Sequence, residues 1–336
     1  MLPPPDIKGQ YRDDSRARAA YAEGAGIYRI LPRAVCLPTD EADLVSLVCW
    51  AADQAIPLIP RGAGSAMGGG NVGEGVIVDL TQLSDMHLQV EARAQKAVTT
   101  AGVTLGQLND AASAHDLRLP PDPSSGAWAT LGGMVSTNAA GPRSLRYGSV
   151  RQWVQSLALV TADGESVTLR RRTPQTGSRA IHRFYQDAAP PILRASAQIE
   201  TRFPHTRKNS SGYALDAFVR SGAALDLVIG SEGTLGIVTR VEWRLDHIPA
   251  HRAGLRASLR SIDSLSEAVR AILSCQPSAV ELLDRTFLDL VAGDTLAGAA
   301  FRFSEADAVL LIELERDDSD SLREALHLAT ARLRLR

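Results

Sequence analysis

The segment 60–70, with the sequence PRGAGSAMGGG, constrains the fold more than any other stretch of this chain. It follows the apolar residues 55–59 and leads through residues 71–75 into a second apolar segment, 76–80. This order predicts a strand, a glycine loop and a second strand. Glycine adopts positive φ without a steric penalty and leaves backbone N–H groups uncovered, so such a loop can surround an anion with donors. The alternative is a flexible connector, which rarely joins two buried strands this close together in sequence.

Two common nucleotide-binding motifs do not fit this loop. A Rossmann fingerprint requires G-x-G-x-x-G at the start of a helix, but Met67 occupies the last glycine position and a strand follows. A Walker loop requires a lysine where this chain has Gly70. The loop therefore belongs to another class of anion-binding fold.

Composition limits the kinds of partner that the chain can have. Its 336 residues suggest about two domains. The 36 basic and 38 acidic residues are well mixed, which predicts no nucleic-acid partner. The three cysteines form no C-x-x-C pair, so we expect neither a disulfide framework nor a metal site. No apolar run is long enough to predict a transmembrane segment, and we expect a cytoplasmic protein that is open to peripheral attachment at the inner membrane.

Local patterns predict a helix, four strands and a second helix, in that order, in the first part of the chain. Thr39 is expected to cap a helix, residues 86–101 to form two strands, and Thr104–His115 to form an amphipathic helix. The strands 153–161 and 165–170 are joined by Ala162-Asp163-Gly164, which predicts a hairpin with a type I′ turn.

Two further glycine-rich regions lie at 120–148 and 230–236. The first shows little periodicity over its whole length, which is typical of a functional loop in a compact domain. The third region precedes an expected strand, Ile237–Leu245. From Pro249 onwards strands and helices alternate again, which predicts a second domain, and the pattern ends in a helix over Ser321–Arg336 without a closing strand. We therefore expect this second domain to be incomplete.

Taken together, the three glycine-rich regions resemble the FAD-binding domain of the p-cresol methylhydroxylase and vanillyl-alcohol oxidase superfamily. The similarity is greatest to the FAD-linked 2-hydroxy-acid dehydrogenases, a branch that includes D-lactate dehydrogenase, the flavoprotein subunit of glycolate oxidase and D-2-hydroxyglutarate dehydrogenase. It covers about residues 12–315 and rests on the order and spacing of its motifs. These motifs are Ile59-Pro-Arg-Gly-Ala-Gly, Pro121-Asp-Pro-Ser-Ser, Thr130-Leu-Gly-Gly-Met-Val-Ser-Thr-Asn-Ala, Arg146-Tyr-Gly and Gly230-Ser-Glu-Gly-Thr-Leu-Gly-Ile-Val.

The resemblance implies an α+β fold with three parts. An N-terminal arm would cover residues 1–30, and a two-subdomain FAD-binding domain of the p-cresol methylhydroxylase type would cover 31–248. Residues 249–336 would begin an α/β cap domain, which is the incomplete domain expected above. Each boundary follows a change in the sequence pattern.

The same resemblance assigns cofactor-binding roles by region. Backbone N–H groups of the first loop would hold the FAD diphosphate, the second region would follow the flavin and ribityl chain, and the third would line the opposite side. The implied residues are Arg61, Gly62, Ala63, Gly64, Ser65, Pro121, Asp122, Thr130, Gly132, Gly133, Ser136, Asn138, Tyr147, Glu232, Gly236, Ile237 and Val238.

Some of these roles have simpler alternatives. Arg61 could be a surface arginine, Asn138 a turn or capping residue, and Ile237 and Val238 plain strand core. Relatives that bind FAD covalently carry a histidine where this chain has Ser65, so we expect noncovalent FAD.

The resemblance also implies the chemistry. The enzyme would be an FAD-dependent dehydrogenase that oxidises the CH–OH group of a D-2-hydroxy acid, such as D-lactate, glycolate or D-2-hydroxyglutarate, to a 2-oxo acid. The base and the metal-binding histidines of relatives have no clear counterpart here, because the one close pair, His247 and His251, reads as a solvated linker. Arg143, Arg146, Arg207 and Lys208 are weak candidates for binding a substrate carboxylate, so the catalytic residues stay unassigned.

Other functions remain open from the sequence. The chain could be a noncatalytic FAD-binding subunit or a truncated product without a substrate site. It could also act on another substrate of the superfamily, such as an alcohol or an enolpyruvyl sugar nucleotide. No cluster-binding cysteine pattern is present, so the electron acceptor or an iron–sulfur region would lie on a partner or in a C-terminal part beyond these residues.

Overall fold

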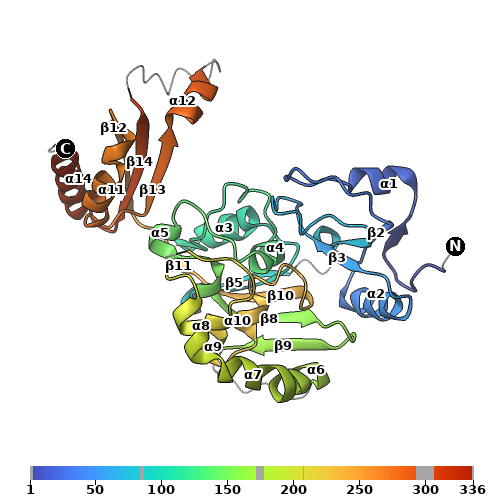
Figure 1. The fold of residues 1–336 in the computed structure, drawn as a ribbon. Coiled ribbons are helices and arrows are strands. Elements are labelled where there is room, and N and C mark those ends of the chain that lie inside the picture. Colours follow the sequence, from blue (N-terminus) through green and yellow to red (C-terminus); the bar gives the residue numbers. More distant parts are fainter. Residues whose placement is uncertain (1–2, 84–86, 172–177, 207, 293–305, 335–336) are drawn as a thin grey trace. The chain divides into compact units, whose positions relative to one another are not determined.

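The computed structural model describes residues 3–83, 87–171, 178–206, 208–292 and 306–334. The chain forms two compact units, whose elements are labelled in Figure 1. The first unit comprises Met1–Leu119, Pro123–Ala139 and Ser149–Asp246, and the second comprises Pro120–Asp122, Ala140–Gly148 and His247–Arg336. Two short segments from the middle of the chain therefore belong with the C-terminal part.

The first unit begins with a four-stranded sheet in the order β1-β2-β4-β3. Strands β2 (Ala34–Leu37), β4 (Val76–Asp79) and β3 (Leu58–Arg61) are parallel, whereas β1 (Gln10–Arg12) joins the edge antiparallel. The predicted strands on both sides of the glycine loop are confirmed. Because β3 and β4 are parallel neighbours, the chain between them must cross back along the sheet. The glycine-rich residues 62–75 make that crossing.

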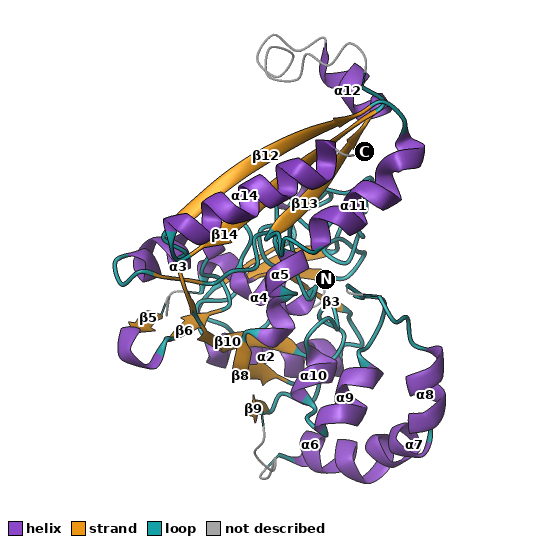
Figure 2. Cartoon of the chain, turned by 90° about the vertical axis from the view of Figure 1, so that its left-hand side faces the viewer, coloured by secondary structure: helices purple, strands orange, loops and turns teal. Residues whose placement is uncertain are grey.

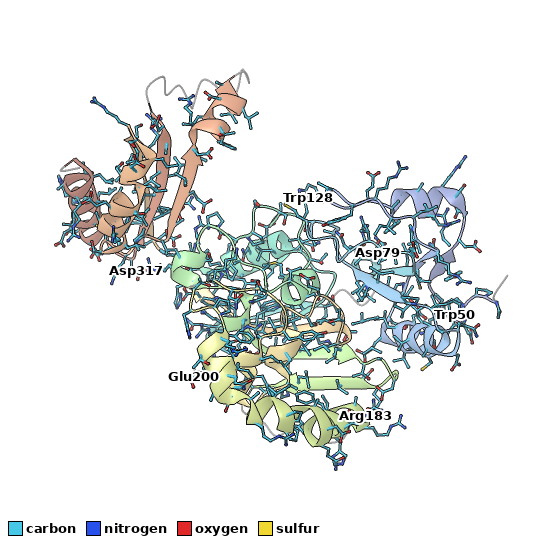
Figure 3. The ribbon with its side chains drawn as sticks, in the orientation of Figure 1. Trp50, Asp79, Trp128, Arg183, Glu200 and Asp317 are labelled. Atoms are coloured by element: carbon cyan, nitrogen blue, oxygen red, sulfur yellow. The ribbon has the colours of Figure 1, made fainter. Side chains whose placement is uncertain are left out.

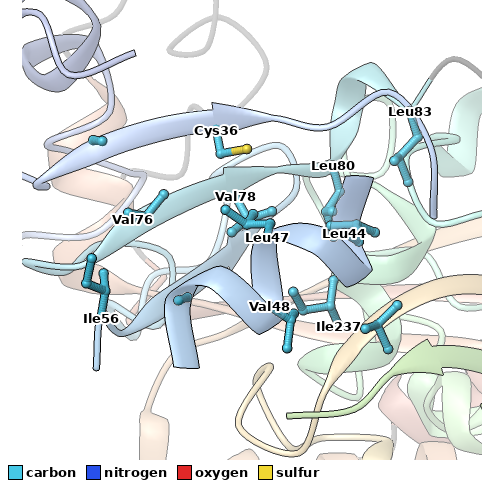
Figure 4. Packing of buried hydrophobic residues seen from close by; sticks show 13 residues of the cluster. Cys36, Leu44, Leu47, Val48, Ile56, Val76, Val78, Leu80, Leu83 and Ile237 are labelled. Atoms are coloured by element: carbon cyan, nitrogen blue, oxygen red, sulfur yellow. The ribbon is translucent and has the colours of Figure 1, made fainter. Parts of the chain in front are cut away.

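Helix α2 (Glu41–Asp53) supplies the core that joins the two sheets of this unit. Its side chains Leu44, Leu47 and Val48 contact Val76 and Val78 of the first sheet, and the cluster extends to Val160 and Ile237 of the second (Figure 4). Burying a leucine side chain contributes about 1.5–3 kcal/mol. This helix therefore fixes the sheet that carries the glycine loop.

The second sheet has five antiparallel strands in the order β5-β6-β10-β8-β9. Long-range pairing places β10 (Ile237–Arg244) between β6 (Lys96–Thr100) and β8 (Val154–Val160). The outer strands are β5 (Leu88–Glu91) and β9 (Ser166–Arg170). The strands predicted within 86–101, 153–170 and 237–245 are confirmed.

The β8–β9 hairpin is confirmed, but its predicted type I′ turn is wrong. Thr161 and Glu165 close a three-residue loop, in which the N–H of Thr161 donates to the carbonyl of Glu165 at 3.0 Å. Of the three loop residues only Gly164 has positive φ, at +76°. A type I′ turn needs positive φ at both central residues, whereas a three-residue loop needs a single left-handed position.

The region 120–148, expected to be irregular, contains two short helices. Helix α4 (Leu131–Ser136) is capped by Thr130, and α5 (Ser144–Tyr147) belongs to the second unit. Packing explains α4 better than its sequence pattern does. Gly132 lies so close to Ala101 that a Cβ there would approach the Ala101 Cβ to 2.5 Å.

The remaining helices and short strands of the first unit surround the two sheets. Helix α3 begins after Thr104, which forms a capping box with Gln107. The elements are α1 (Ser15–Ala20), α3 (Leu105–Ser113), β7 (Leu117–Arg118), α6 (Arg179–Arg183), a π-helical turn (Phe184–Ala188), α7 (Ala189–Arg194), α8 (Ser196–Arg202), α9 (Leu215–Ser221) and α10 (Leu225–Val228). Strand β11 (Asp246–His247) lies where the chain passes into the second unit.

The second unit is an antiparallel sheet in the order β12-β14-β13 with helices on one face (Figure 2). The strands are β12 (His251–Leu259), β13 (Ala279–Asp284) and β14 (Ala308–Arg316). Helices α11 (Leu265–Leu273) and α14 (Ser319–Arg334) bury Ile272 and Ala329 against Leu310, Ile312 and Leu314. Helix α12 spans Arg285–Ala292. The predicted alternation of strands and helices is confirmed in these described residues.

Asp43 ties the N-terminal arm to the start of α2. Its buried carboxylate accepts hydrogen bonds from the backbone N–H of Lys8 (2.8 Å) and Gly9 (2.9 Å), and from the N–H and hydroxyl of Thr39 (both 2.8 Å). The N-cap of α2 is therefore Asp40, whose carboxylate accepts from the Asp43 N–H, and the cap predicted at Thr39 is wrong. Burial alone raises the pKa of Asp43, but these hydrogen bonds outweigh it and hold the pKa below its ordinary value.

Replacing Asp43 by asparagine should lower the free energy of unfolding by about 1–3 kcal/mol at pH 7. The depressed pKa contributes stability above the unfolded value of about 3.9, and that contribution disappears as the pH falls through the folded pKa. The difference in the free energy of unfolding between wild type and D43N, measured with urea, should therefore become smaller in acid. Asp53 is exposed at the end of the same helix. The free energy of unfolding of D53N should therefore fall in acid as much as that of the wild type. An advantage that stays constant down to pH 3 would contradict this role of Asp43.

Candidate cofactor site

The first unit contains a cavity of about 340 Å³ beside the glycine loop. Three stretches of chain line it, and they lie within residues 60–71, 123–139 and 232–238. They follow β3, surround α4 and precede or begin β10. The cavity thus brings together all three regions that the sequence singled out.

The glycine loop presents its backbone to this cavity. Gly64 has a φ of +73°, and a Cβ there would lie 2.6 Å from Nη2 of Arg61, so only glycine fits. Among the described residues, no acceptor pairs with the backbone N–H groups of residues 63–68. A run of free N–H groups on a turning backbone is a concave anion site. A diphosphate therefore fits this loop.

Arg61 supports the loop from behind instead of pointing its charge into the cavity. Its guanidinium donates to the carbonyls of Tyr21 (3.2 Å) and Asn71 (3.3 Å) and lies over the Tyr21 ring. The Tyr21 hydroxyl in turn donates to Asp79 at 2.5 Å, and burial together with this carboxylate raises the pKa of Tyr21 to about 12. The side chain of Arg61 is half-buried, so it is not the surface arginine considered as its alternative.

The N-terminal arm covers the outer side of the loop. The N–H of Ala25 donates to the carbonyl of Gly64 at 3.0 Å, and the Asn71 side chain donates to the same carbonyl at 2.7 Å. Gly69 lies under the ring of Tyr28, where a Cβ would approach the ring to 2.7 Å. These contacts hold the loop beside the cavity. Asp79, which anchors Tyr21, is labelled in Figure 3.

Helix α4 and the residues around it form the second wall. Thr130, Gly132, Gly133 and Ser136 line the cavity as predicted, and Thr137 joins them. The Ser136 hydroxyl donates to the carbonyl of Gly132 at 2.9 Å, which leaves its lone pairs to accept from a ligand. On the same stretch Trp128 is 75% exposed (Figure 3), next to the lining residue Ala129. Its indole is placed to report on events at this wall by fluorescence.

The third wall is a tight turn after α10. Glu232 has a φ of +54°, which is unusual for a residue with a side chain, and its N–H donates to the carbonyl of Ser136 at 2.8 Å. Its carboxylate extends toward the glycine loop, where Oε2 lies 3.4 Å from the position of a Cβ on Gly70. Gly233, Gly236 and Val238 complete this wall.

The structure brings twelve of the predicted residues together around the cavity. They are Arg61, Gly62, Ala63, Gly64, Ser65, Thr130, Gly132, Gly133, Ser136, Glu232, Gly236 and Val238.

Five predicted residues lie elsewhere. Ile237 belongs to the hydrophobic core around α2, and successive strand residues point to opposite faces, so Ile237 and Val238 do not both face the cavity. Asn138 is a buried left-handed residue with a φ of +48°, whose side chain accepts from the N–H of Arg151. Pro121, Asp122 and Tyr147 belong to the second unit.

The sequence analysis missed several lining residues. Among them are Pro60, Met67, Asn71, Ser125, Thr137 and Gly233. Pro60, Thr137 and Gly233 adjoin predicted positions, whereas Met67, Asn71 and Ser125 lie two or more residues away from one.

In the second unit, acidic residues surround Arg143. Its guanidinium forms two hydrogen bonds with Glu313, at 2.6 and 3.0 Å, and lies 3.2 Å from Asp122 and 3.7 Å from Glu315. The hydrogen bonds with Glu313 raise the pKa of Arg143 above its ordinary value. Burial alone would raise the pKa of Glu313, but Arg143 and Ser278 outweigh it and lower the pKa. The guanidinium of Arg143 is therefore already paired with these carboxylates.

The neighbouring candidates have partners of their own. The Tyr147 hydroxyl donates to Glu315 at 2.7 Å, and Arg146 donates to the Glu315 carbonyl at 2.8 Å. Lys208 is exposed, and Arg207 lies outside the described residues. Within the described part of the chain, no group of three or more His, Cys, Asp or Glu side chains is arranged to hold a metal ion. The part of the chain that the structure describes also has no helix long and apolar enough to cross a membrane.

Comparisons with known proteins identify both parts of the chain. Residues 32–170 match the family model described as FAD binding domain, and residues 248–335 match the C-terminal domain of FAD linked oxidases. The chain is 30% identical over 297 residues to a D-lactate dehydrogenase of Archaeoglobus fulgidus, covering 86% of this chain and 56% of that protein. It is 28% identical to a D-2-hydroxyglutarate dehydrogenase of Pseudomonas putida, covering 90% of this chain and 31% of that protein.

A glycolate oxidase subunit GlcD of Bacillus subtilis is 30% identical, with 90% of this chain and 56% of that protein covered. The chain thus spans about a third to a half of the length of these relatives. Among solved structures, an alkyldihydroxyacetonephosphate synthase superposes with a TM-score of 0.67 at 20% identity, covering 97% of this chain and 56% of that one. A BBE-like 1 protein of Physcomitrella patens gives 0.64 at 16% identity. These likenesses confirm the predicted α+β fold class.

The glycine loop can be tested with two alanine substitutions that strain the backbone equally. Gly64 and Gly212 both have positive φ, at +73° and +66°, so alanine should cost about 1–2 kcal/mol of stability at either site. Only G64A also drives a Cβ into Arg61, since the space around Gly212 is open. We expect G64A to weaken FAD binding at least about tenfold, measured by flavin fluorescence titration, and G212A to leave it unchanged. Equal FAD affinity in both variants would show that the loop does not hold the cofactor.

Proposed function

Because this chain belongs to the FAD-linked oxidases, we propose that it holds FAD noncovalently in the cavity of the first unit and oxidises a D-2-hydroxy acid. The observation that carries this proposal is the run of free N–H groups over residues 63–68, whose loop lines the cavity together with the other two motif regions. The FAD diphosphate would lie against these N–H groups. The isoalloxazine ring would supply the electron acceptor for the substrate when FAD is bound.

The other two walls would position the remainder of the cofactor. Gly133 has open space beyond the Thr130 hydroxyl, so the backbone of α4 can come close to a flat ligand. The Ser136 hydroxyl and the Glu232 carboxylate can accept hydrogen bonds from ribityl or ribose hydroxyls. Val238 and Met134 supply apolar surface that excludes water from the cavity.

Noncovalent attachment follows from the side chains of the loop. Ser65 stands where relatives with covalent FAD carry histidine, and a serine hydroxyl does not provide the ring nitrogen that such a bond uses. Asn71, Thr130 and Ser136 also line the cavity, and none of them is a strong nucleophile. Acid or heat should therefore release intact FAD.

The substrate class is proposed from the relatives. Their names specify D-lactate, D-2-hydroxyglutarate and glycolate, all of which carry a hydroxyl group beside a carboxylate. Oxidation of such a substrate needs a base for the hydroxyl proton and a cation for the carboxylate. Arg143 is already paired with Glu313, so we leave both roles unassigned. The electron acceptor would lie on a partner, or on an iron–sulfur region of one, and the protein would act in the cytoplasm or at the inner face of the membrane.

The purified chain should be yellow, and the flavin should appear in the supernatant after acid precipitation. Loss of colour to the supernatant supports noncovalent FAD, whereas flavin that stays with the precipitate would show a covalent bond. A chain that stays colourless after incubation with FAD would refute the cofactor assignment.

Substrate oxidation is read from the flavin itself. Anaerobic mixing with D-lactate, glycolate and D-2-hydroxyglutarate should bleach the flavin absorbance with at least one of them, and L-lactate and L-2-hydroxyglutarate serve as controls for the two chiral acids. Dithionite must bleach the same sample, which shows that the flavin can be reduced. A flavin that responds to dithionite but to none of the three acids would favour the alternative, a noncatalytic FAD-binding subunit.

A further inference from the structure

The third wall of the cavity contains a strained residue, Glu232, directly after the glycine turn at Gly230. Gly230 and Glu232 have φ values of +90° and +54°. Their N–H groups donate to the carbonyls of Val135 (3.0 Å) and Ser136 (2.8 Å), which joins this wall to α4. Strained turns persist only where their surroundings fix them. The groups that fix residues 230–236 therefore decide the shape of the cavity.

Arg151 forms hydrogen bonds with the segment that precedes the third wall and with the residue that follows α4. It lies in a 3-10 turn, Val150–Gln152, and its side chain is only 17% exposed. The guanidinium donates through Nη1 to the carbonyl of Asp226, and through Nη2 to the carbonyl of Ile229, the residue before Gly230. The backbone N–H of Arg151 donates to the side chain of Asn138, two residues beyond the end of α4, at 3.3 Å.

Arg171 provides a natural comparison, because it binds the same buried carboxylate. Asp226 lies 3.2 Å from Nη1 of Arg151 and 3.1 Å from Nη1 of Arg171. Two further acceptors of Arg171 are the carbonyls of Val154 and Arg151, which lie in the sheet and in the 3-10 turn and not in the cavity wall. Both arginines therefore neutralise Asp226, but the hydrogen bond to Ile229 comes from Arg151.

We propose that Arg151 is a positioning residue for the cofactor, because it fixes the carbonyl of Ile229 and thereby holds residues 230–236 against α4. The inference rests on the proposed binding of FAD in this cavity. The planar fork of arginine can donate to two carbonyls and a carboxylate at once, which a lysine ammonium cannot do in the same geometry. Arg151 touches no cavity atom itself and acts through Glu232 and Gly233.

This role of Arg151 can be tested without any cofactor. Hydrogen–deuterium exchange of the full chain, free of FAD, should show faster exchange at the amides of Gly230 and Glu232 in R151M than in wild type, by about tenfold or more. In R171M the same amides should exchange at the wild-type rate. Faster exchange at these amides in both variants, or in neither, would overturn the proposal.

The consequence for the cofactor is measured separately. Flavin fluorescence titration should give an FAD dissociation constant about tenfold higher for R151M than for wild type, while R171M stays within about twofold. Urea unfolding of the two FAD-free variants shows whether both lose similar stability through Asp226. A purely structural role predicts that FAD affinity falls in proportion to stability in both variants, and that result would refute positioning.

Two further variants keep the test decisive if R151M does not fold. R151K keeps the charge that Asp226 needs but not the fork, so it should fold and still bind FAD more weakly than R171K. N138G keeps the left-handed backbone and removes the acceptor for the Arg151 N–H, so it should also speed exchange at Glu232. Wild-type exchange and FAD affinity in R151K and N138G would overturn the inference. These readouts involve no hydroxy acid, so they stay separate from a failure of the proposed reaction.

Discussion

The parallel pairing of β3 with β4 is the constraint on which the site depends. Leu58 pairs with Val76 and Arg61 with Asp79, so the chain must leave the end of one strand and return to the start of its neighbour. Such a return is usually made by a helix. Here residues 62–75 make it without one, and glycines allow the backbone to turn close to the sheet. The crossing leaves unpaired N–H groups in one place, and the cavity lies beside them.

The anion site consequently depends on backbone and not on side-chain charge. Arg61, the cation of the motif, turns behind the loop and bonds to the carbonyls of Tyr21 and Asn71. Tyr21 donates to Asp79, and with a pKa near 12 it stays protonated at neutral pH. The side chains of this region hold the backbone of the loop in place through hydrogen bonds.

Local sequence patterns predicted the elements well and the placement of side chains less well. The helix after Thr104 and the β8–β9 hairpin depend on residues within a few positions of one another, and both predictions hold. Asn138 and Ile237 were assigned to the cofactor because they belong to motifs. The pleat of β10 turns Ile237 into the core, and the left-handed turn after α4 gives Asn138 to Arg151. Partners such as Tyr147 and Glu315, 168 positions apart, have no local signature.

A contact closes the two ends of the segment that carries α4. Asp122 and Arg143 flank the stretch that carries α4, and they meet in the second unit through an ion pair of 3.2 Å and a hydrogen bond of 3.1 Å from the Arg143 N–H. Gly141 allows this closure, because a Cβ there would lie 2.1 Å from the Asp122 carbonyl. Joining the ends of a loop removes much of its conformational entropy. The pairing of Asp122 with Arg143 thus restrains both ends of this segment.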